Sequence, residues 1–516
     1  MDNLTINKPP QYLSTSEIKK HSHEDDCWII VNSKVYDVSA FHKEHPGGSN
    51  IIMRYAGGDA TAAYDEIHAP GIIEDELSRN RFLGVVHESE MDKLKANLNL
   101  EDPKEREVAS EPQSEQIHPS ITTASLEEPQ TYTKPPLRTL ISLHDFEDVA
   151  RNTFTKKAFA FYSSAATDLV THNLNSSYYK RILLRPRVLR NVREVSIKKR
   201  ILGCESSAPF FVSPAAMARL AHPEGEMALA RGCAGEGIIQ VISSNASHTL
   251  ESIIKAGRPG QPFFLQLYVN TDRSKSAQLL IKARELGIKA IFVTVDAPVP
   301  GKREADERIA AESNVVSAIS GARAENDKKG GGMGRLMAKY VDSGLCWEDV
   351  RWIRETSGLP VVLKGVQCAM DARLAVEYGI EGIMLSNHGG RSLDTSPPSI
   401  LTLLELHKSA PEVFSKLEIY VDGGIMRGTD VVKALALGAT AVGVGRPYLY
   451  SLAYGEKGVE HLTSIMKDEL VTSLKLCGVT DIDQLHPGML NTGAVDHMVL
   501  DGGQHPYIKW KPKSML

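Results

Sequence analysis

The 516-residue sequence lacks the features typical of disulfide-rich, zinc-binding and membrane-spanning proteins. Its six cysteines are widely scattered and include no C-x-x-C pair, so neither a disulfide framework nor a zinc site is indicated, and a reducing compartment is favoured. No run of about 18 apolar residues occurs, which argues against a membrane span. A formal net charge of only -5 gives no reason to expect binding to nucleic acid or to an anionic membrane surface.

The amino terminus also lacks an apolar signal core and the Arg-rich, acid-poor composition of a transit peptide. We therefore expect a cytoplasmic protein. With 42% hydrophobic and 24% charged residues the chain has the composition of a soluble globular protein, and it is too long for a single core. Two or more domains are expected.

Residues 88–134 interrupt the globular pattern. Eleven acidic residues stand there against five basic ones, together with four prolines and few large apolar side chains. This composition predicts a flexible linker. It separates a small module, residues 10–87, from a large one, residues 135–490, which a tail of residues 491–516 follows.

From Pro209 onward the large module repeats a short apolar run, a polar or glycine-bearing turn and a longer amphipathic stretch. Continuous apolar strands alternating with helices predict a parallel sheet covered on both faces, and eight of them predict a closed (β/α)8 TIM barrel. The alternative, an open doubly wound sheet, lacks the G-x-G-x-x-G turn expected after its first strand. The eight runs are Phe210 to Ser213, Ile238 to Ser243, Phe263 to Tyr268, Ala290 to Val295, Pro360 to Lys364, Gly382 to Ser386, Leu417 to Val421 and Ala441 to Val444.

An insertion at about residues 304–345 follows the fourth run and carries the charged, glycine-rich stretch from Lys328 to Gly334. At this position in a barrel it is either an active-site lid or a disordered loop.

The small module contains two candidate metal ligands, His45 and His68. Two facing imidazoles can hold a haem iron from both sides, which suits electron transfer; the alternative is a turn residue and a solvated helix residue. The module resembles cytochrome b5 domains in His45-Pro46-Gly47-Gly48, Trp28-Ile29-Ile30, Val35-Tyr36-Asp37-Val38 and His68. The resemblance implies a small α+β fold that binds haem b, with His45 and His68 as its axial ligands.

In the large module, polar residues follow the predicted strands, and in a barrel these strand ends converge on one face. Within the hexapeptide Ser386 to Arg391, His388 can accept a proton near neutral pH and Arg391 can hold a carboxylate through two nitrogens. This pair suits the oxidation of a small hydroxy acid, whereas the alternative is a surface loop without function. The other strand ends carry Gln266, Tyr268, Thr294, Asp296, Arg303, Lys364, Asp422-Gly423-Gly424 and Gly445-Arg446-Pro447.

The turns after the seventh and eighth runs expose backbone N–H groups and a cation where barrels usually bind phosphate, which indicates a phosphorylated cofactor. Lys364 would then face the reactive ring, where a positive charge stabilises a flavin that becomes anionic on reduction. The residues alone do not distinguish a flavin from another phosphate-bearing ligand.

The large module resembles the FMN-dependent α-hydroxy acid dehydrogenases and oxidases from about residue 138 to 485. The matching motifs are Leu267-Tyr268-Val269, Thr294-Val295-Asp296-Ala297-Pro298, Leu363-Lys364-Gly365-Val366, Ser386 to Arg391, Asp422-Gly423-Gly424 and Gly445-Arg446-Pro447. The resemblance implies that His388 is the base and that Asp296 orients it and stabilises its imidazolium. It also implies that Arg391 and Arg303 hold the carboxylate and that Tyr268 contacts the substrate hydroxyl. The implied FMN-binding residues are Ala215, Ala216, Ser243, Gln266, Thr294, Lys364, Ser386, Asp422, Gly424, Gly445 and Arg446.

The sequence departs from the family pattern at four positions. Phe161 stands where a tyrosine usually binds the carboxylate, and a lost hydrogen bond to a charged group is worth about 1.5–3 kcal/mol. Met426 replaces an arginine near the FMN phosphate, although Arg427 follows it. Ala215 stands where threonine is frequent, and Asn245 occupies a pocket position that is usually apolar or aromatic. These changes bear on the substrate more than on the reaction.

The order of cytochrome b5 domain, linker and flavin barrel resembles the flavocytochrome branch of this family. It implies that a small L-2-hydroxy acid, lactate-like, is oxidised and that electrons pass from FMN to haem and then to cytochrome c or another one-electron acceptor. The alternatives are an oxidase that reduces O2 to hydrogen peroxide, and an electron-transfer protein without catalysis. The resemblance also implies a homotetramer, and it makes mitochondria the alternative to the cytoplasm.

Overall fold

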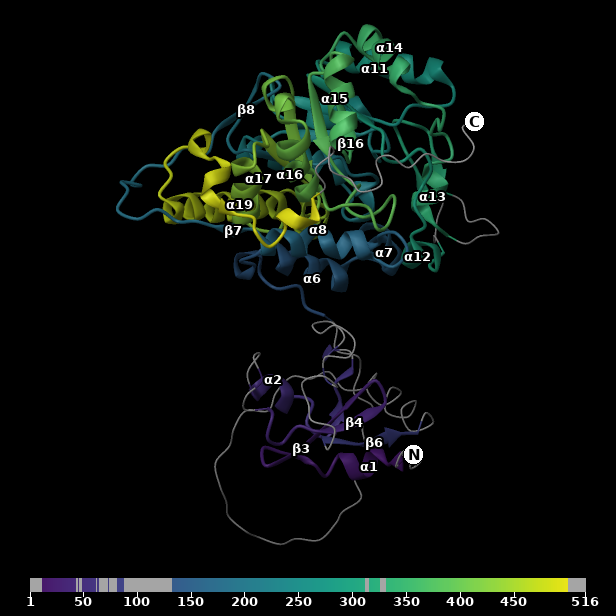
Figure 1. Ribbon diagram of the computed structural model, residues 1–516. Coiled ribbons are helices and arrows are strands. Elements are labelled where there is room, and N and C mark those ends of the chain that lie inside the picture. The colour runs from purple at the N-terminus through teal and green to yellow at the C-terminus, as the bar shows by residue number, and fades with distance from the viewer. Residues whose placement is uncertain are drawn as a thin grey trace, which may run out of the picture. The chain divides into compact units, whose positions relative to one another are not determined.

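The computed structural model describes residues 12–42, 45, 49–61, 63–64, 73, 81–87, 132–310, 315–324 and 331–499 (Figure 1). The chain divides into two compact units, residues 1–125 and 126–516, and each is described by itself. Most of the predicted linker, residues 88–131, lies outside the described residues, so its flexibility stays a prediction.

The first unit is built on a small mixed sheet. Its strands run in the order β1-β6-β4-β3-β2, and β5 pairs with β3. Alternate residues of β3 face two different small cores, because Cys27, Ile29 and Val31 belong to one cluster and Ile30 to another. The described elements are β1 (Tyr12–Leu13), α1 (Thr15–Ile18), β2 (Ser22–His23), β3 (Asp26–Val31), β4 (Lys34–Asp37), α2 (Ser49–Met53), β5 (Gly58–Asp59) and β6 (Phe82–Val86).

The second unit contains a closed barrel of eight strands in which every neighbouring pair is parallel. Each strand falls within or next to one of the eight apolar runs, so the predicted TIM barrel is confirmed and the open-sheet alternative is wrong. The strands are β10 (Phe210–Val212), β11 (Gln240–Ser243), β12 (Phe263–Leu267), β13 (Ala290–Thr294), β16 (Val361–Val366), β17 (Gly382–Leu385), β18 (Glu418–Asp422) and β19 (Ala441–Val444).

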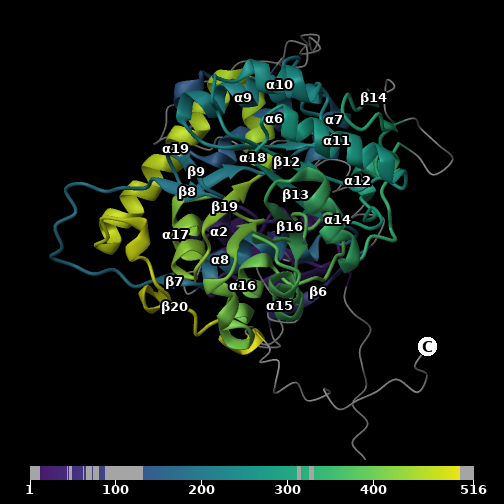
Figure 2. The ribbon, with the colours of Figure 1, turned by 90° about the horizontal axis from the view of Figure 1, so that it is seen from above.

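Helices surround the barrel, as the view along its axis shows (Figure 2). Because helices cover the outer face and side chains fill the inner one, almost every strand residue is buried, which explains the continuous apolar runs. These helices are α9 (Gly225–Glu236), α10 (Leu250–Ala256), α11 (Arg273–Glu285), α14 (Trp347–Ser357), α15 (Ala369–Glu377), α16 (Ser399–Ser409), α17 (Gly428–Ala436) and α19 (Gly455–Cys477).

Aromatic side chains fill the barrel interior. Phe264 stacks on Phe292 with ring centroids 5.5 Å apart, and Phe211 and Tyr420 complete the cluster. The hairpin of β8 (Lys199–Ile201) and β9 (Cys204–Ser206) closes the amino-terminal end, where Ile201 joins this cluster. With that end closed, ligands can enter only from the carboxyl ends of the strands.

The insertion after β13 has regular elements where the structure describes it, but residues 311–314 and 325–330, with the start of the Lys328 to Gly334 stretch, lie outside the described residues, so the choice between a lid and a disordered loop stays open. Its described parts contain α12 (Glu304–Glu307), β14 (Val315–Val316), β15 (Arg323–Ala324) and α13 (Met333–Met337). Lys157 forms a buried ion pair with Asp306 at 2.6 Å and also donates to the Gly331 carbonyl at 2.7 Å. Asp306 Oδ2 in turn accepts from the Gly334 N–H at 2.9 Å. These contacts fix the insertion to the helix that carries Lys157.

Shorter elements complete the second unit. They are η2 (Leu137–Thr139), α6 (Leu143–Thr153), α7 (Lys156–Ser163), α8 (Val170–Arg181), β7 (Leu183–Leu184), η3 (Ala218–Leu220), η4 (Pro411–Ser415), α18 (Arg446–Ser451), η5 (Leu452–Tyr454), η6 (Ile482–Gln484), η7 (Pro487–Met489), β20 (Leu490–Asn491) and η8 (Asp496–Met498). Within the described residues, no helix combines the length and the apolar character that a bilayer crossing requires.

Candidate active site

Side chains from the carboxyl ends of all eight strands meet around a cavity of about 650 Å³. Of the predicted site residues in this unit, only Asp296 and Ser386 do not line it, and both contact His388 instead. The residues that line the cavity are Ala215, Ala216, Ser243, Gln266, Tyr268, Thr294, Arg303, Lys364, His388, Arg391, Asp422, Gly424, Gly445 and Arg446.

His388 lies between an acid and a phenol. Its Nδ1 is 2.9 Å from Asp296 Oδ1, and its Nε2 is 3.2 Å from the Tyr268 hydroxyl. Because a carboxylate only accepts hydrogen bonds, Nδ1 carries the proton and Nε2 keeps its lone pair. Burial raises the pKa of Tyr268 above its ordinary value of 10.0, so this hydroxyl stays protonated and donates to Nε2.

Backbone conformation aims the His388 side chain at Asp296. His388, Gly389 and Gly390 all have left-handed backbones, with φ of 60°, 64° and 75°. At Gly390 a side chain would also collide with the backbone of His172, 2.6 Å from the position of the added Cβ. A histidine in this conformation is strained unless its surroundings hold it, and such strain is typical of functional sites.

The charges around His388 determine its protonation. Burial lowers its pKa below 6.5, the Asp296 carboxylate raises it, and Lys364 and Arg303 lower it further, with the net shift downward. For Asp296, burial raises the pKa, but the His388 and Lys364 charges outweigh this and lower it below 3.8. At neutral pH the site therefore holds a neutral imidazole beside a carboxylate, which is the arrangement of a general base.

Three arginines gather on one side of the cavity. Arg391 donates to the carbonyls of Phe161 at 2.7 Å and Tyr162 at 2.8 Å, and Arg446 Nε donates to the same Tyr162 carbonyl at 3.1 Å. Arg303 Nε donates to the Arg391 carbonyl at 3.4 Å. Among the described residues none of the three has a carboxylate within ion-pair distance.

These arginines make the cavity attractive to anions. Burial lowers the pKa of Arg391 well below 12.5, and the charges of Arg303 and Arg446 lower it further. Burial likewise lowers the pKa of Arg303 and of Arg446. Buried cations that repel one another are stabilised by a bound anion, so the arrangement suits a carboxylate or a phosphate.

Lys364 projects from β16, at a register shift between Lys364 and Val366. Its Nζ donates to Ser386 Oγ at 3.1 Å and lies 3.5 Å from Asp422 Oδ2. Burial lowers the pKa of Lys364, but Asp422 and Asp296 raise it more, so the group is charged. Ser386 Oγ thus accepts hydrogen bonds from Lys364 Nζ and from the backbone N–H of His388, the latter at 3.1 Å.

A hydrogen-bonded chain crosses three neighbouring strand ends. Ser243 Oγ donates to Gln266 Oε1 at 3.0 Å, and Gln266 Nε2 donates to Thr294 Oγ1 at 2.9 Å. Since the Gln266 amide is held from both sides, its orientation is fixed. Such a polar row can bind the edge of a planar heterocycle through amide and hydroxyl groups.

The cavity wall has polar groups and a volume that suit FMN. Ser213 Oγ and Asp422 Oδ1 are buried there and have no hydrogen-bond partner within the described chain. At Gly424, with φ of 80°, an added Cβ would collide with the Asn175 carbonyl, so only glycine allows this turn to pack closely against α8. Lys364 supplies the charge expected beside a flavin ring, and Arg446 the charge expected beside its phosphate.

Arg427 does not take the place that Met426 leaves. Both residues line the cavity, but the Arg427 guanidinium forms an ion pair with Glu469 at 2.7 Å, so its charge is already paired. Lys433, also in the wall, donates to the Tyr179 carbonyl at 2.8 Å, and burial lowers its pKa.

In the first unit the structure describes His45 but not His68, which lies outside the described residues. The His45 ring packs edge-on against Phe41 with centroids 5.8 Å apart. The predicted pairing of these histidines around a haem iron therefore stays a prediction.

Several residues that sequence reasoning missed complete the wall. The Tyr162 hydroxyl donates to the Met217 carbonyl at 2.6 Å, and the amides of Asn175 and Asn387 exchange hydrogen bonds at 2.8 Å. Ser213 ends the first apolar run. Taking the polar residue at each strand end, as for Lys364, would therefore identify Ser213 too.

Comparison with known proteins gives two family matches. Residues 150–492 match the FMN-dependent dehydrogenase family, and residues 14–87 match the cytochrome b5-like haem/steroid binding domain. The L-lactate dehydrogenase (cytochrome) of Saccharomyces cerevisiae is 40% identical over 496 residues, covering 95% of this chain and 80% of the relative. The enzyme of the same name from Wickerhamomyces anomalus is 39% identical over 487 residues, covering 94% of this chain and 80% of the relative.

Solved structures agree with these matches. The recombinant flavin-binding domain of baker's yeast flavocytochrome b2 has a TM-score of 0.64 and 40% sequence identity, covering 74% of this chain and 94% of that one. Mandelate oxidase with (S)-4-hydroxymandelic acid has a TM-score of 0.64 and 35% identity, covering 68% and 98%.

Proposed function

Because the chain belongs to the FMN-dependent dehydrogenase family and carries a cytochrome b5-like domain, it is an oxidoreductase that uses FMN and haem, and we propose that it oxidises a small L-2-hydroxy acid to the 2-oxo acid. The observation that carries this proposal is the neutral His388 held between Asp296 and Tyr268, beside buried arginines for which the described residues provide no carboxylate partner. Each functional group of a 2-hydroxy acid then has a matching partner in the site: a base for the carbon that carries the hydroxyl group, and cations for the carboxylate.

The residues of the chain divide the work. His388 Nε2 accepts a proton from the substrate, and the Asp296 carboxylate stabilises the imidazolium that forms. Tyr268 donates to the substrate hydroxyl once Nε2 turns to the substrate. Arg391 and Arg303 hold the carboxylate, and the carbonyls of Phe161 and Tyr162 keep Arg391 in place.

FMN supplies the two-electron acceptor and haem b the one-electron carrier of this chemistry. The residues assigned to FMN all belong to the cavity wall except Ser386, which contacts it through Lys364. His45 and His68 are the residues that would hold the haem iron. The final acceptor is a one-electron carrier such as cytochrome c, as in the relatives named L-lactate dehydrogenase (cytochrome).

Anaerobic mixing with a panel of 2-hydroxy acids tests the proposal. We expect flavin bleaching first and haem reduction second. No bleaching by any acid would leave only the electron-transfer protein without catalysis. Aerobic turnover that yields one hydrogen peroxide per oxo acid, without reduction of added cytochrome c, would favour the oxidase.

The haem ligands can be tested by replacing His68 with Ala. The variant should lose the haem absorbance and all cytochrome c reduction but keep flavin bleaching at the normal rate, because the catalytic residues lie in the other unit. Replacing His23, an exposed histidine of the same unit, with Ala is the matched control and should change neither signal. Normal cytochrome c reduction by His68→Ala would refute the assignment.

Replacing Phe161 with Tyr should tighten the binding of small acids. The Phe161 ring lies 5.3 Å from the Arg391 guanidinium and lines the cavity, so a hydroxyl there can reach the carboxylate that Arg391 holds. One added hydrogen bond to a charged group predicts a roughly 10-fold lower Kd for the 2-oxo acid product. Titration of the flavin absorbance measures this Kd. Phe159→Tyr, on the same helix but outside the cavity, should leave it unchanged.

Assembly and location complete the proposal. We place the protein in the cytoplasm as a homotetramer, with mitochondria as the alternative location. All six cysteines are free, which supports a reducing compartment. The tetramer rests on family resemblance alone, and the mass of the native particle in solution tests it.

A further inference from the structure

Asn245 lies in the cavity wall directly after β11, two residues beyond Ser243. Its side chain is 4% exposed, and its backbone N–H donates to Ser243 Oγ at 3.1 Å. The same cavity is lined by His388, Arg391 and Tyr268, so Asn245 faces the place that the substrate occupies.

Two hydroxyl groups from the insertion hold the Asn245 carbonyl oxygen. Ser320 Oγ donates to Asn245 Oδ1 at 2.6 Å, and the Tyr340 hydroxyl donates to the same atom at 2.9 Å. The insertion is itself fixed at this point, since the Ala318 N–H and Ser317 Oγ donate to the Ala246 carbonyl at 3.0 and 3.1 Å. The Asn245 amide therefore cannot turn without breaking two buried hydrogen bonds.

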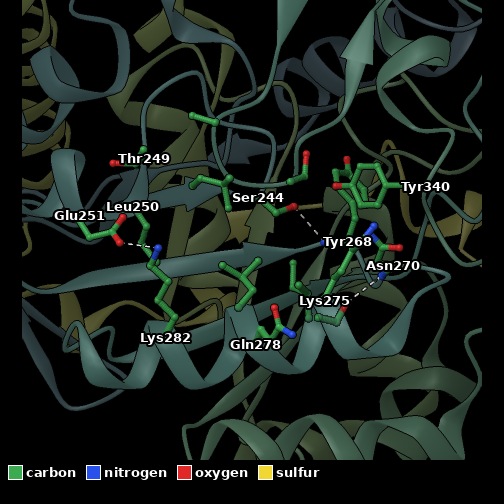
Figure 3. A pocket seen from close by; sticks show the side chains of 16 residues that line it. Ser244, Thr249, Leu250, Glu251, Tyr268, Asn270, Lys275, Gln278, Lys282 and Tyr340 are labelled. Carbon is green, nitrogen blue, oxygen red and sulfur yellow. Dashed lines mark hydrogen bonds and ion pairs between the residues drawn. The ribbon is translucent and has the colours of Figure 1, made fainter.

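A second cavity, of about 270 Å³, lies behind this wall (Figure 3). Ser320, Tyr340 and Ser244 line it, and Tyr268 lines both cavities. Figure 3 places Tyr340 and Tyr268 at one end, away from the ion pair of Glu251 and Lys282. Asn245 and its two partners thus form a polar partition between the substrate cavity and this second cavity.

The Asn245 amide nitrogen, Nδ2, is available to donate a hydrogen bond. Both hydroxyls donate to Oδ1, and among the described residues no acceptor is found for Nδ2. Nδ2 is not among the sealed atoms without a partner, so it is open to the cavity, where an acceptor on a ligand can take its hydrogen bond.

We propose that Asn245 Nδ2 donates a hydrogen bond to an oxygen on the side chain of the substrate, so that the preferred substrates are 2-hydroxy acids with an oxygen beyond C2. This inference rests on the proposed function and names its substrate class. A C3 hydroxyl, as in glycerate, satisfies the donor, whereas the methyl group of lactate leaves it unpaired. A site built around a hydrogen bond rejects the analogue that lacks it more strongly than an apolar pocket rejects an extra methylene. Ser320 and Tyr340 are positioning residues that act through Asn245.

The test compares L-glycerate with L-lactate on the full-length protein loaded with FMN and haem. Two quantities are measured, kcat/KM for flavin reduction and the Kd of hydroxypyruvate against that of pyruvate by flavin absorbance. We expect wild type to prefer the oxygen-bearing acid of each pair, and Asn245→Leu to lower that preference about 10- to 100-fold. Tyr340→Phe should lower it less, because Ser320 still holds Oδ1. Asn191→Leu, an exposed asparagine, should leave it unchanged.

Asn245→Ala also removes the donor and places no larger side chain in the wall, so it tests the proposal if Asn245→Leu does not fold. It should weaken glycerate more than lactate. A wild-type preference for lactate, or a ratio that neither Asn245 variant changes, overturns the inference. Failure of the proposed function is a separate result. In that case neither L-glycerate nor L-lactate bleaches the flavin, while the ratio of the Kd values of hydroxypyruvate and pyruvate still reports on Asn245.

Discussion

Flavin reduction by 2-hydroxy acids should fall about 100- to 10,000-fold when His388 is replaced by Gln, while the absorbance of both cofactors is retained. Glutamine can accept a hydrogen bond but cannot take a proton, so only the proton transfer is removed. The effect is large because Nε2 is the basic atom of the site and Asp296 fixes its tautomer at 2.9 Å. Stopped-flow bleaching under anaerobic conditions measures the rate.

His248→Gln is the matched control, because His248 lies outside the cavity wall and its Nε2 contacts the Pro223 carbonyl at 3.3 Å. It should reduce at the wild-type rate. If His388→Gln bleached as fast as this control, another group would have to be the base. Tyr268 would be the first alternative, although burial raises its pKa and makes it a poor proton acceptor.

Much of the barrel could be predicted because buried parallel strands are continuously apolar. The run predicted from Gly382 to Ser386 differs from β17 by one residue, and Ala441 to Val444 agrees with β19. The strand-end rule also brought His388, Arg391 and Lys364 to one cavity, since every parallel strand points its carboxyl end to the same face.

Contacts made by the irregular segments could not be predicted. Asn245 meets Ser320 and Tyr340 across 75 and 95 residues, and no periodicity marks either partner. The ion pair of Arg427 with Glu469 could not be predicted for a similar reason, since Glu469 lies on α19, 42 residues away. Such pairs depend on the path of loops, which carry no repeating pattern of burial.

A second large effect is expected when Asp296 is replaced by Asn: kcat/KM should fall about 100- to 10,000-fold, and its dependence on pH should also change. The Asp296 side chain is fully buried, and its negative charge stabilises the imidazolium that forms when His388 takes the proton. Asparagine has nearly the same shape but no charge. Loss of rate with retained FMN absorbance would therefore report the lost charge together with the lost control of the His388 tautomer.

The direction of the pH change follows from the sign of the interaction. The proposed base must be neutral, so kcat/KM should fall as the pH drops through the pKa of His388, which burial places below 6.5. The Asp296 charge raises this pKa, so removing it must lower the pKa further and move the acid limb of the profile to lower pH. Asp342→Asn, which removes a carboxylate that pairs with Arg273 at 2.8 Å, is the control and should leave the limb in place. An acid limb that moves to higher pH in Asp296→Asn would mean that the essential neutral group is not His388. Of the groups that perturb the pKa of His388, only Asp296 raises it, so removing the Asp296 charge cannot raise that pKa.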